Sequence, residues 1–252
     1  MNVVLALAAF DRAHFQVSSA QERPSLMQAA GLFALDFCEQ ELGQRPWPVL
    51  LFDDQAVRIP LPRGESPEVW ARRWLTLEPE ARELVDAREP LDAREPAEAA
   101  ANGLARVSSH LFHGRGQLAP LRRAVAEVRA ATDGHPTVVL VFLTGNPLDA
   151  PQMLGELRDA AGDPVFWVFL TTSWDVEPLS LDGFDPPGAG PGAPADFAVI
   201  RTHGWSPWAR RRRARAIRRA VSRWLRGLPV QILEPQDSAE PEPAAGPPGA
   251  GA

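Results

Sequence analysis

Residues 135–170 read HPTVVLVFLTGNPLDAPQMLGELRDAAGDPVFWVFL, and this stretch decides the fold. It contains two continuous apolar runs, Val138–Leu143 and Val165–Leu170, which are rich in β-branched and aromatic residues. Such runs are typical of strands that are covered on both faces. The intervening segment Pro151–Ala161 has the length of a helix, and Asp149 precedes it as an N-cap. A strand, a helix and a second strand in this order predict a parallel pair within an α/β sheet.

The same alternation extends over the rest of the chain. Further apolar runs predict strands, and apolar residues at helical spacing predict helices. The additional strands are Val3–Phe10, Val49–Phe52 and Phe197–Ile200, and the additional helices are Ser25–Leu42, Leu118–Ala131 and Trp208–Leu228. Asp53 and Asp54 lie between two short apolar runs and predict a tight hairpin with one antiparallel edge strand. We therefore predict a doubly wound α/β fold, with a mostly parallel central sheet and helices on both faces.

The composition predicts one domain and two segments outside its core. The chain has 252 residues, of which 45% are hydrophobic and 23% are charged, as in ordinary globular proteins. We expect a single domain over residues 1–230, with a charged low-complexity insertion at 78–102 that contains DAREPLDAREP. Residues 231–252 are rich in proline, glycine, alanine and acid, which predicts a disordered tail. The apolar N-terminus lacks a preceding basic region, and no apolar run approaches the roughly 20 residues of a membrane span. We therefore expect a cytoplasmic protein.

Charge and motif content disfavour several classes of function. A formal net charge of −6 argues against nucleic-acid binding through bulk charge. A single cysteine, Cys38, excludes an internal disulfide and a cysteine-rich zinc module. His110 and His113 have a spacing found in some metal sites, but a surface pair explains them better. No hydrolase elbow, dinucleotide-binding turn or P-loop motif is present, so we predict no enzymatic activity, no catalytic residue and no cofactor.

Several segments in the same order resemble a known family. Besides 135–170, these are RGQLAPLRRAV at 115–125 and ALDFCEQELGQRPWPVLLFDDQAVRIPLP at 34–62. Together they resemble bacterial von Willebrand factor A (vWA) domains, particularly those associated with tellurium-resistance (Ter) and stress-response systems. There, a strand ending in Thr-Asp-Gly precedes a helix with Leu-Arg-Asp/Glu-Ala and a Pro-apolar-Phe-Trp strand. The resemblance covers most of residues 2–228 outside the insertion.

The resemblance implies a metal-ion-dependent adhesion site, from which this chain departs at every loop. In the family, Asp-x-Ser-x-Ser after the first strand, a Thr from a second loop and an Asp from a third supply oxygen ligands to Mg²⁺. Here the first Asp position falls on Ala8 or on Asp11. The residues in place of the two serines are then Phe10 and Arg12, or Ala13 and Phe15. The Thr position falls on Gly116 and the third-loop Asp on Gly145. We therefore predict a degenerate site that holds no metal.

A vWA-type scaffold without its metal predicts a non-enzymatic protein-interaction module, a scaffold or adaptor in a bacterial stress-response or conflict system. Its partner would be another protein, which the sequence does not identify. Doubly wound sheets bind their ligands at the carboxyl ends of the strands. The candidate partner-binding rim at these ends consists of Asp11, Arg12, His14, Gln117, Asn146 and Asp149.

The last predicted helix offers a second candidate surface. Its sequence, SPWARRRRARAIRRAVSRWLRGL at 206–228, is amphipathic. The apolar face consists of Ile217, Val221, Trp224, Leu225 and Leu228. The candidate basic face consists of Arg212, Arg215, Arg219, Arg223 and Arg226. Two interpretations stay open. Either the apolar face covers the sheet while solvated arginines contact at most an acidic partner, or the arginines bind nucleic acid or another anionic surface.

Overall fold

The computed structural model describes the chain in thirteen stretches. These are residues 1–10, 12–16, 24–43, 46, 48–62, 64–76, 111, 118–132, 134–143, 150–160, 163–171, 196–201 and 204–228. The predicted insertion at 78–102 and the predicted tail at 231–252 lie outside these residues, as does the histidine pair. Within the described residues the chain forms six strands, one 3-10 helix and five α-helices.

Six strands form one sheet in the order β3-β2-β1-β4-β5-β6. Their bounds are β1 Asn2–Ala8, β2 Val49–Phe52, β3 Ala56–Ile59, β4 Thr137–Leu143, β5 Val165–Thr171 and β6 Phe197–Arg201. Neighbouring strands run parallel, except that β2 and β3 pair antiparallel across the hairpin at Asp53 and Asp54. The predicted doubly wound sheet with one antiparallel edge strand is confirmed, and its strand order reverses between β1 and β4.

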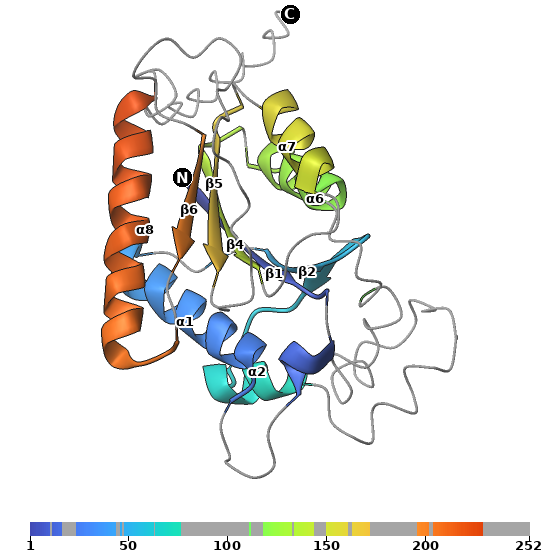
Figure 1. Ribbon diagram of the computed structural model, residues 1–252, viewed down its shortest axis with the longest axis vertical. Helices are drawn as coiled ribbons and strands as arrows, with labels where there is room; N and C mark the ends of the chain where they lie inside the picture. Colours follow the sequence, from blue (N-terminus) through green and yellow to red (C-terminus); the bar gives the residue numbers. More distant parts are fainter. Residues whose placement is uncertain are drawn as a thin grey trace, which may run out of the picture.

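Helices cover both faces of this sheet. Their bounds are η1 Arg12–Phe15 (a 3-10 helix), α1 Leu26–Glu41, α2 Pro67–Trp74, α6 Ala119–Ala130, α7 Ala150–Asp159 and α8 Pro207–Gly227. Helices α1 and α8 lie on one side of the sheet, and α6 and α7 lie on the other (Figure 1). Among the described residues, no helix combines the length and the apolar character needed to cross a lipid bilayer.

The alternation of side chains along each strand divides the core into two layers. In β1, Val3, Leu5 and Leu7 pack into the layer that contains α1, α2 and α8. Val4 and Ala6 point the opposite way, into the layer beneath α6 and α7. Strands β4 and β5 are buried along their whole length, which explains why their sequences are continuous apolar runs rather than alternating ones.

Helix α1 begins and ends at residues suited to those positions. Ser25 accepts a hydrogen bond from the backbone N–H of Gln28 (3.1 Å), and the Gln28 side chain accepts one from the backbone N–H of Ser25 (2.9 Å). This capping box satisfies two N–H groups at the helix start. Beyond the C-cap, Gly43 has a φ of 63°, a left-handed conformation that glycine adopts without strain.

Helix α2 was not anticipated by the strand and helix pattern, because it spans only eight residues. Ser66 caps it, and Pro67 occupies its first turn. Its packing depends on Gly31 of α1, where a Cβ atom would lie 2.4 Å from Leu75 Cδ1 and 3.2 Å from Trp70. The Trp70 indole N–H also donates to the backbone carbonyl of Pro60 (2.6 Å). A close helix contact of this kind is tertiary information that local periodicity does not carry.

Candidate functional site

The carboxyl ends of the strands, where the partner-binding rim was predicted, are described only in part. Asp11, Gln117, Asn146 and Asp149 lie outside the described residues. Arg12 begins η1, and His14 in the same turn is half-buried. Of the six predicted rim residues, the structure places these two in one turn, directly after β1.

The described part of this edge is lined largely by apolar side chains. Phe15 of η1 is fully buried, and Phe10 contacts Phe52 at the end of β2 edge to face, with ring centroids 5.5 Å apart. Asp53 follows Phe52 and is fully buried, and its backbone N–H donates to the Gln55 carbonyl (2.9 Å) within the hairpin. Among the described residues, no three His, Cys, Asp or Glu side chains gather as they would around a metal ion.

Helix α8 presents the most distinctive surface among the described elements. Ser206 caps it by accepting from the backbone N–H of Ala209 (3.2 Å), and Pro207 occupies the first turn. Its 21 residues pack over β5, β6 and α1. Ile217, Val221 and Trp224 are buried, so the predicted apolar face covers the sheet. Leu225 and Leu228 are partly buried at the margin of the same layer.

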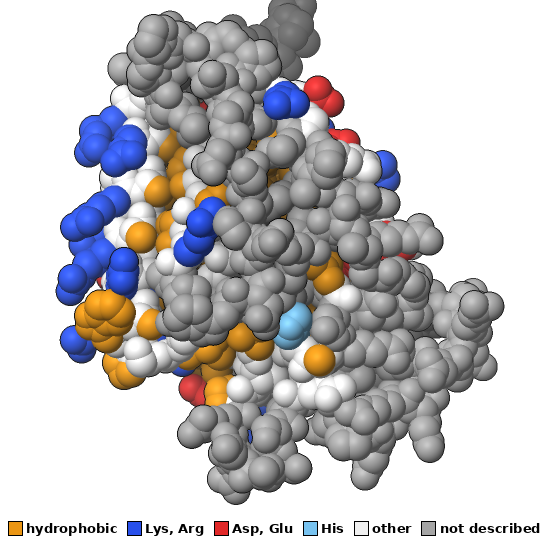
Figure 2. Space-filling model, viewed as in Figure 1, with side chains coloured by type: hydrophobic (Ala, Val, Ile, Leu, Met, Phe, Trp, Pro, Cys, Tyr) orange, Lys and Arg blue, Asp and Glu red, His pale blue; other side chains and the backbone are white. Residues whose placement is uncertain are grey.

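The five arginines of the predicted basic face are all exposed. They follow one another at intervals of three or four residues, which places them on one stripe of the helix. Trp208 belongs to the same stripe, four residues before Arg212, and is 68% exposed. The Arg212 guanidinium lies over the Trp208 ring, 5.4 Å from its centroid. We call the six residues Trp208, Arg212, Arg215, Arg219, Arg223 and Arg226 the outer α8 surface; Figure 2 shows basic side chains gathered along this helix.

A cavity of about 270 Å³ adjoins this surface, between α1 and α8. Four arginines line it, Arg210, Arg211, Arg215 and Arg218, together with the carboxylates of Asp36 and Glu41. Arg218 donates to Glu41 at 3.0 Å. Because arginines outnumber carboxylates here, the positive character of the outer α8 surface continues into the groove beside α1.

One arginine of the same helix is not part of any exposed face. Arg213 is fully buried, its guanidinium lying 4.2 Å from the centroid of the Trp205 ring and 5.1 Å from that of Phe33. It also donates to the backbone carbonyl of Gly204 (3.1 Å). Burial, and secondarily the charge of Arg210, lower the pKa of the Arg213 guanidinium to about 10.

Sequence reasoning missed this buried arginine, although a signal for it exists. Arg213 precedes Ile217 by four residues, so helical periodicity places it on the apolar face. The run of four arginines at 210–213 obscures that position, because its composition suggests solvent exposure throughout. The structure shows instead that Arg213 joins the start of α8 to α1 and to the segment after β6 through aromatic stacking.

Comparison of the sequence with known proteins finds no matching family model and no curated protein that is significantly similar. The fold and the surfaces described above are therefore the grounds on which function is argued.

Proposed function

We propose that this protein is a non-enzymatic protein-interaction module of vWA type without a working metal site, and that its outer α8 surface binds an acidic segment of a partner protein. One observation carries the proposal: Trp208 is 68% exposed and lies on the same helical stripe as five exposed arginines. Large exposed aromatic side chains next to arginines are typical of protein interfaces, in which tryptophan and arginine contribute much of the binding free energy.

The outer α8 surface is not needed to build the core. The opposite face of the helix supplies Ile217, Val221 and Trp224 to the core, whereas none of the five exposed arginines has a carboxylate partner among the described residues. The stripe from Trp208 to Arg226 spans about 27 Å at 1.5 Å per residue, which matches an extended or helical peptide segment. Guanidinium groups bind carboxylates through paired hydrogen bonds, so an acidic partner fits this surface.

The remaining elements of the proposal rest on the vWA resemblance. A mostly parallel sheet with one antiparallel edge strand is compatible with a vWA domain, although the strand order 3-2-1-4-5-6 also occurs in dinucleotide-binding folds. The substitutions at Gly116 and Gly145 support a domain that binds its partner without Mg²⁺. A cytoplasmic location and a role in a bacterial stress-response or conflict system follow only from this resemblance.

Binding of nucleic acid or an anionic membrane through the same arginines is the second candidate function. The exposed arginine stripe is the observation that favours it, because phosphates also pair with guanidinium groups. The formal net charge of −6 disfavours a highly charged polyanion more than a short acidic segment of a protein.

A binding assay with three defined probes separates the two candidates. We would measure fluorescence anisotropy or co-sedimentation with a DNA duplex, with phosphatidylserine vesicles and with a glutamate-rich peptide at physiological salt. We expect DNA binding no tighter than the non-specific range of about 10⁻⁴–10⁻⁶ M and steeply dependent on salt. Sequence-specific DNA binding at nanomolar concentration, or stable retention on vesicles, would overturn the proposed protein-interaction function.

A further inference from the structure

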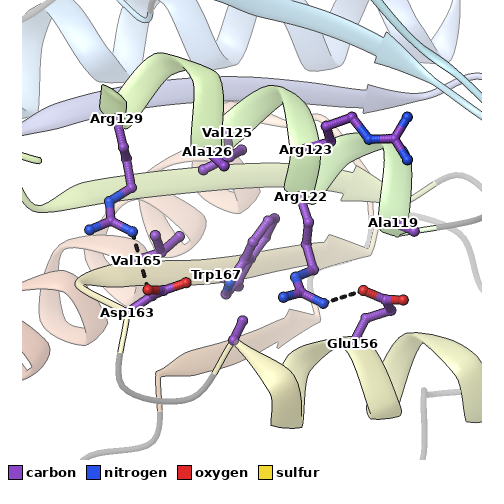
Figure 3. Close-up of a pocket in the computed structure, with 11 residues that line it drawn as sticks. Ala119, Arg122, Arg123, Val125, Ala126, Arg129, Glu156, Asp163, Val165 and Trp167 are labelled. Atoms are coloured by element: carbon purple, nitrogen blue, oxygen red, sulfur yellow. Dashed lines mark hydrogen bonds and ion pairs between the residues drawn. The ribbon is translucent and has the colours of Figure 1, made fainter. Parts of the chain in front are cut away.

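A second cavity lies on the opposite side of the sheet from α8, between α6 and α7 and over the first half of β5 (Figure 3). Its volume is about 360 Å³, within the usual range of small-molecule sites. Trp167 of β5 forms its floor, and α6 contributes Arg122, Arg123 and Arg129. We call this cavity the α6–α7 groove.

Two ion pairs, only one of them close, border the α6–α7 groove. Arg122 pairs with Glu156 of α7, and Arg129 Nη1 lies 3.4 Å from Asp163 Oδ1 (Figure 3). Arg123 has no carboxylate partner among the described residues. The Arg123 guanidinium extends away from Trp167 (Figure 3), so the two arginines that face the groove are matched by two carboxylates. Because the side chains of Arg122 and Arg129 are only 25% and 19% exposed, water screens their charges less than it screens those of surface arginines.

Two N–H groups that border this groove have no hydrogen-bond acceptor among the described residues. Trp167 is 3% exposed, and its indole Nε1 has no partner in the described part of the chain; the same holds for Arg129 Nε. A buried donor without an acceptor destabilises the folded protein, typically by about 1–3 kcal/mol. Both groups are donors and neither can accept, so a group that supplies acceptor oxygens satisfies both.

We propose that the α6–α7 groove binds a small-molecule oxyanion, the phosphate or carboxylate group of a metabolite. Arg129 supplies the positive charge, and the Trp167 indole N–H and Arg129 Nε supply directed hydrogen bonds to the oxygens of the ligand. The Asp163 side chain is 55% exposed and makes a long contact with Arg129, so an incoming oxyanion replaces it at little cost. The site is separate from the outer α8 surface.

The indole N–H of Trp167 provides a direct readout of this proposal. The chain has eight tryptophans, each of which contributes one indole N–H peak to a ¹H–¹⁵N spectrum, and Trp167→Phe identifies the peak of Trp167. If that variant does not fold, sequential assignment of the wild-type protein identifies the peak instead. Inorganic phosphate and malonate would be titrated separately at constant ionic strength, with chloride as the control. The probe that binds more tightly distinguishes a phosphate ligand from a carboxylate ligand.

We expect a saturable downfield shift of the Trp167 indole proton with at least one probe, while the peaks of the buried Trp224 and the exposed Trp208 stay in place. Arg129→Gln should weaken binding by at least about tenfold, since it removes hydrogen bonds from a charged donor. The matched control Arg72→Gln, which removes the same charge from α2, should leave the affinity unchanged. A Trp167 peak that does not saturate, equal shifts of all indole peaks, or equal weakening by Arg72→Gln would each overturn the proposal.

Discussion

The two faces of α8 use the same residue types for opposite purposes. Trp224 is 2% exposed and stacks on Phe166, with ring centroids 5.3 Å apart, whereas Trp208 is 68% exposed beneath Arg212. Arg213 is buried between two aromatic rings, whereas its neighbour Arg212 lies at the surface. Position on the helix, rather than residue type, therefore decides whether a tryptophan or an arginine is buried in the core or exposed at the surface. Substitutions on the inner face should therefore change stability, and those on the outer face should change binding alone.

The largest expected effect is that of Trp224→Ala on the inner face. Removing a buried, stacked indole leaves a cavity, and we expect a loss of about 3–5 kcal/mol in the free energy of unfolding. Urea denaturation measures this loss. The adjacent substitution Arg223→Ala is the matched control and should stay within about 0.5 kcal/mol of the wild type. Equal losses for both variants would show that the outer face also supports the fold.

Arg213→Ala tests whether a buried arginine on α8 is structural. It removes the stacking on Trp205 and Phe33 and the hydrogen bond to Gly204. We expect a loss of about 2–3 kcal/mol in chemical denaturation. Arg213→Met fills the same volume without a buried charge and should cost less than about 1 kcal/mol. If Arg212→Ala were as destabilising as Arg213→Ala, the distinction between the two faces would not hold.

The pH dependence of stability tests whether water is excluded from the core layer beneath α8. Cys38 of α1 lies in this layer, and burial raises the pKa of its thiol to about 12. In the unfolded chain the thiol ionises near about pH 8.5, so above that pH the unfolded state loses the proton first. The stabilising contribution of the protonated thiol is therefore complete below about pH 8.5 and declines as the pH rises toward 12.

We expect the wild type to lose about 1–2 kcal/mol relative to Cys38→Ala between pH 8 and pH 10, measured by urea denaturation at each pH. The chain contains no lysine and no tyrosine, so few other groups titrate in this interval. The lowered pKa of Arg213 makes stability rise with pH rather than fall. Because both proteins contain Arg213, this effect cancels in the comparison. Parallel pH profiles for the two proteins would mean that water reaches the thiol.

We expect the smallest effect from divalent cations, because partner binding is proposed for the outer α8 surface and not for a metal ion at the strand ends. A site with a Kd near 0.1 mM would add about 2.7 kcal/mol at about 10 mM Mg²⁺ and raise the melting temperature by several degrees. We expect identical melting curves in MgCl₂, MnCl₂ and EDTA. A rise in melting temperature specific to Mg²⁺ or Mn²⁺ would show that other side chains rebuild the adhesion site at the carboxyl ends of the strands. It would favour that edge of the sheet over α8 as the binding site.

Much of this fold could be predicted from the sequence because its core strands are continuous apolar runs. β2 has the predicted bounds, and β4 and β5 differ from prediction by one residue at one end. The two faces of α8 also follow from periodicity. Helix α2 could not be predicted in the same way, because it depends on a contact with Gly31, which is distant in sequence. The burial of Arg213 agrees with helical spacing, but the run of four arginines at 210–213 obscures it.

The candidate site was predictable to a lesser degree. The five exposed arginines were identified from helical spacing, but the exposure of Trp208 was not, since an aromatic residue near a helix start is as easily buried as exposed. No local sequence pattern predicts the α6–α7 groove. Arg129 and Trp167 meet there only because β5 lies beside β4 and under α6.

The most direct test of the central claim compares partner binding and stability in one triple variant. The α8 variant removes the middle of the outer α8 surface and carries Arg215→Gln, Arg219→Gln and Arg223→Gln. The control variant removes the same charge from β3 and α2 and carries Arg58→Gln, Arg72→Gln and Arg73→Gln. Affinity enrichment from cells that naturally make the protein, followed by a binding titration with the recovered partner, provides the measurement. We predict that the α8 variant keeps its free energy of unfolding within about 1 kcal/mol and loses the partner, whereas the control retains it. Full partner binding by the α8 variant would contradict the account.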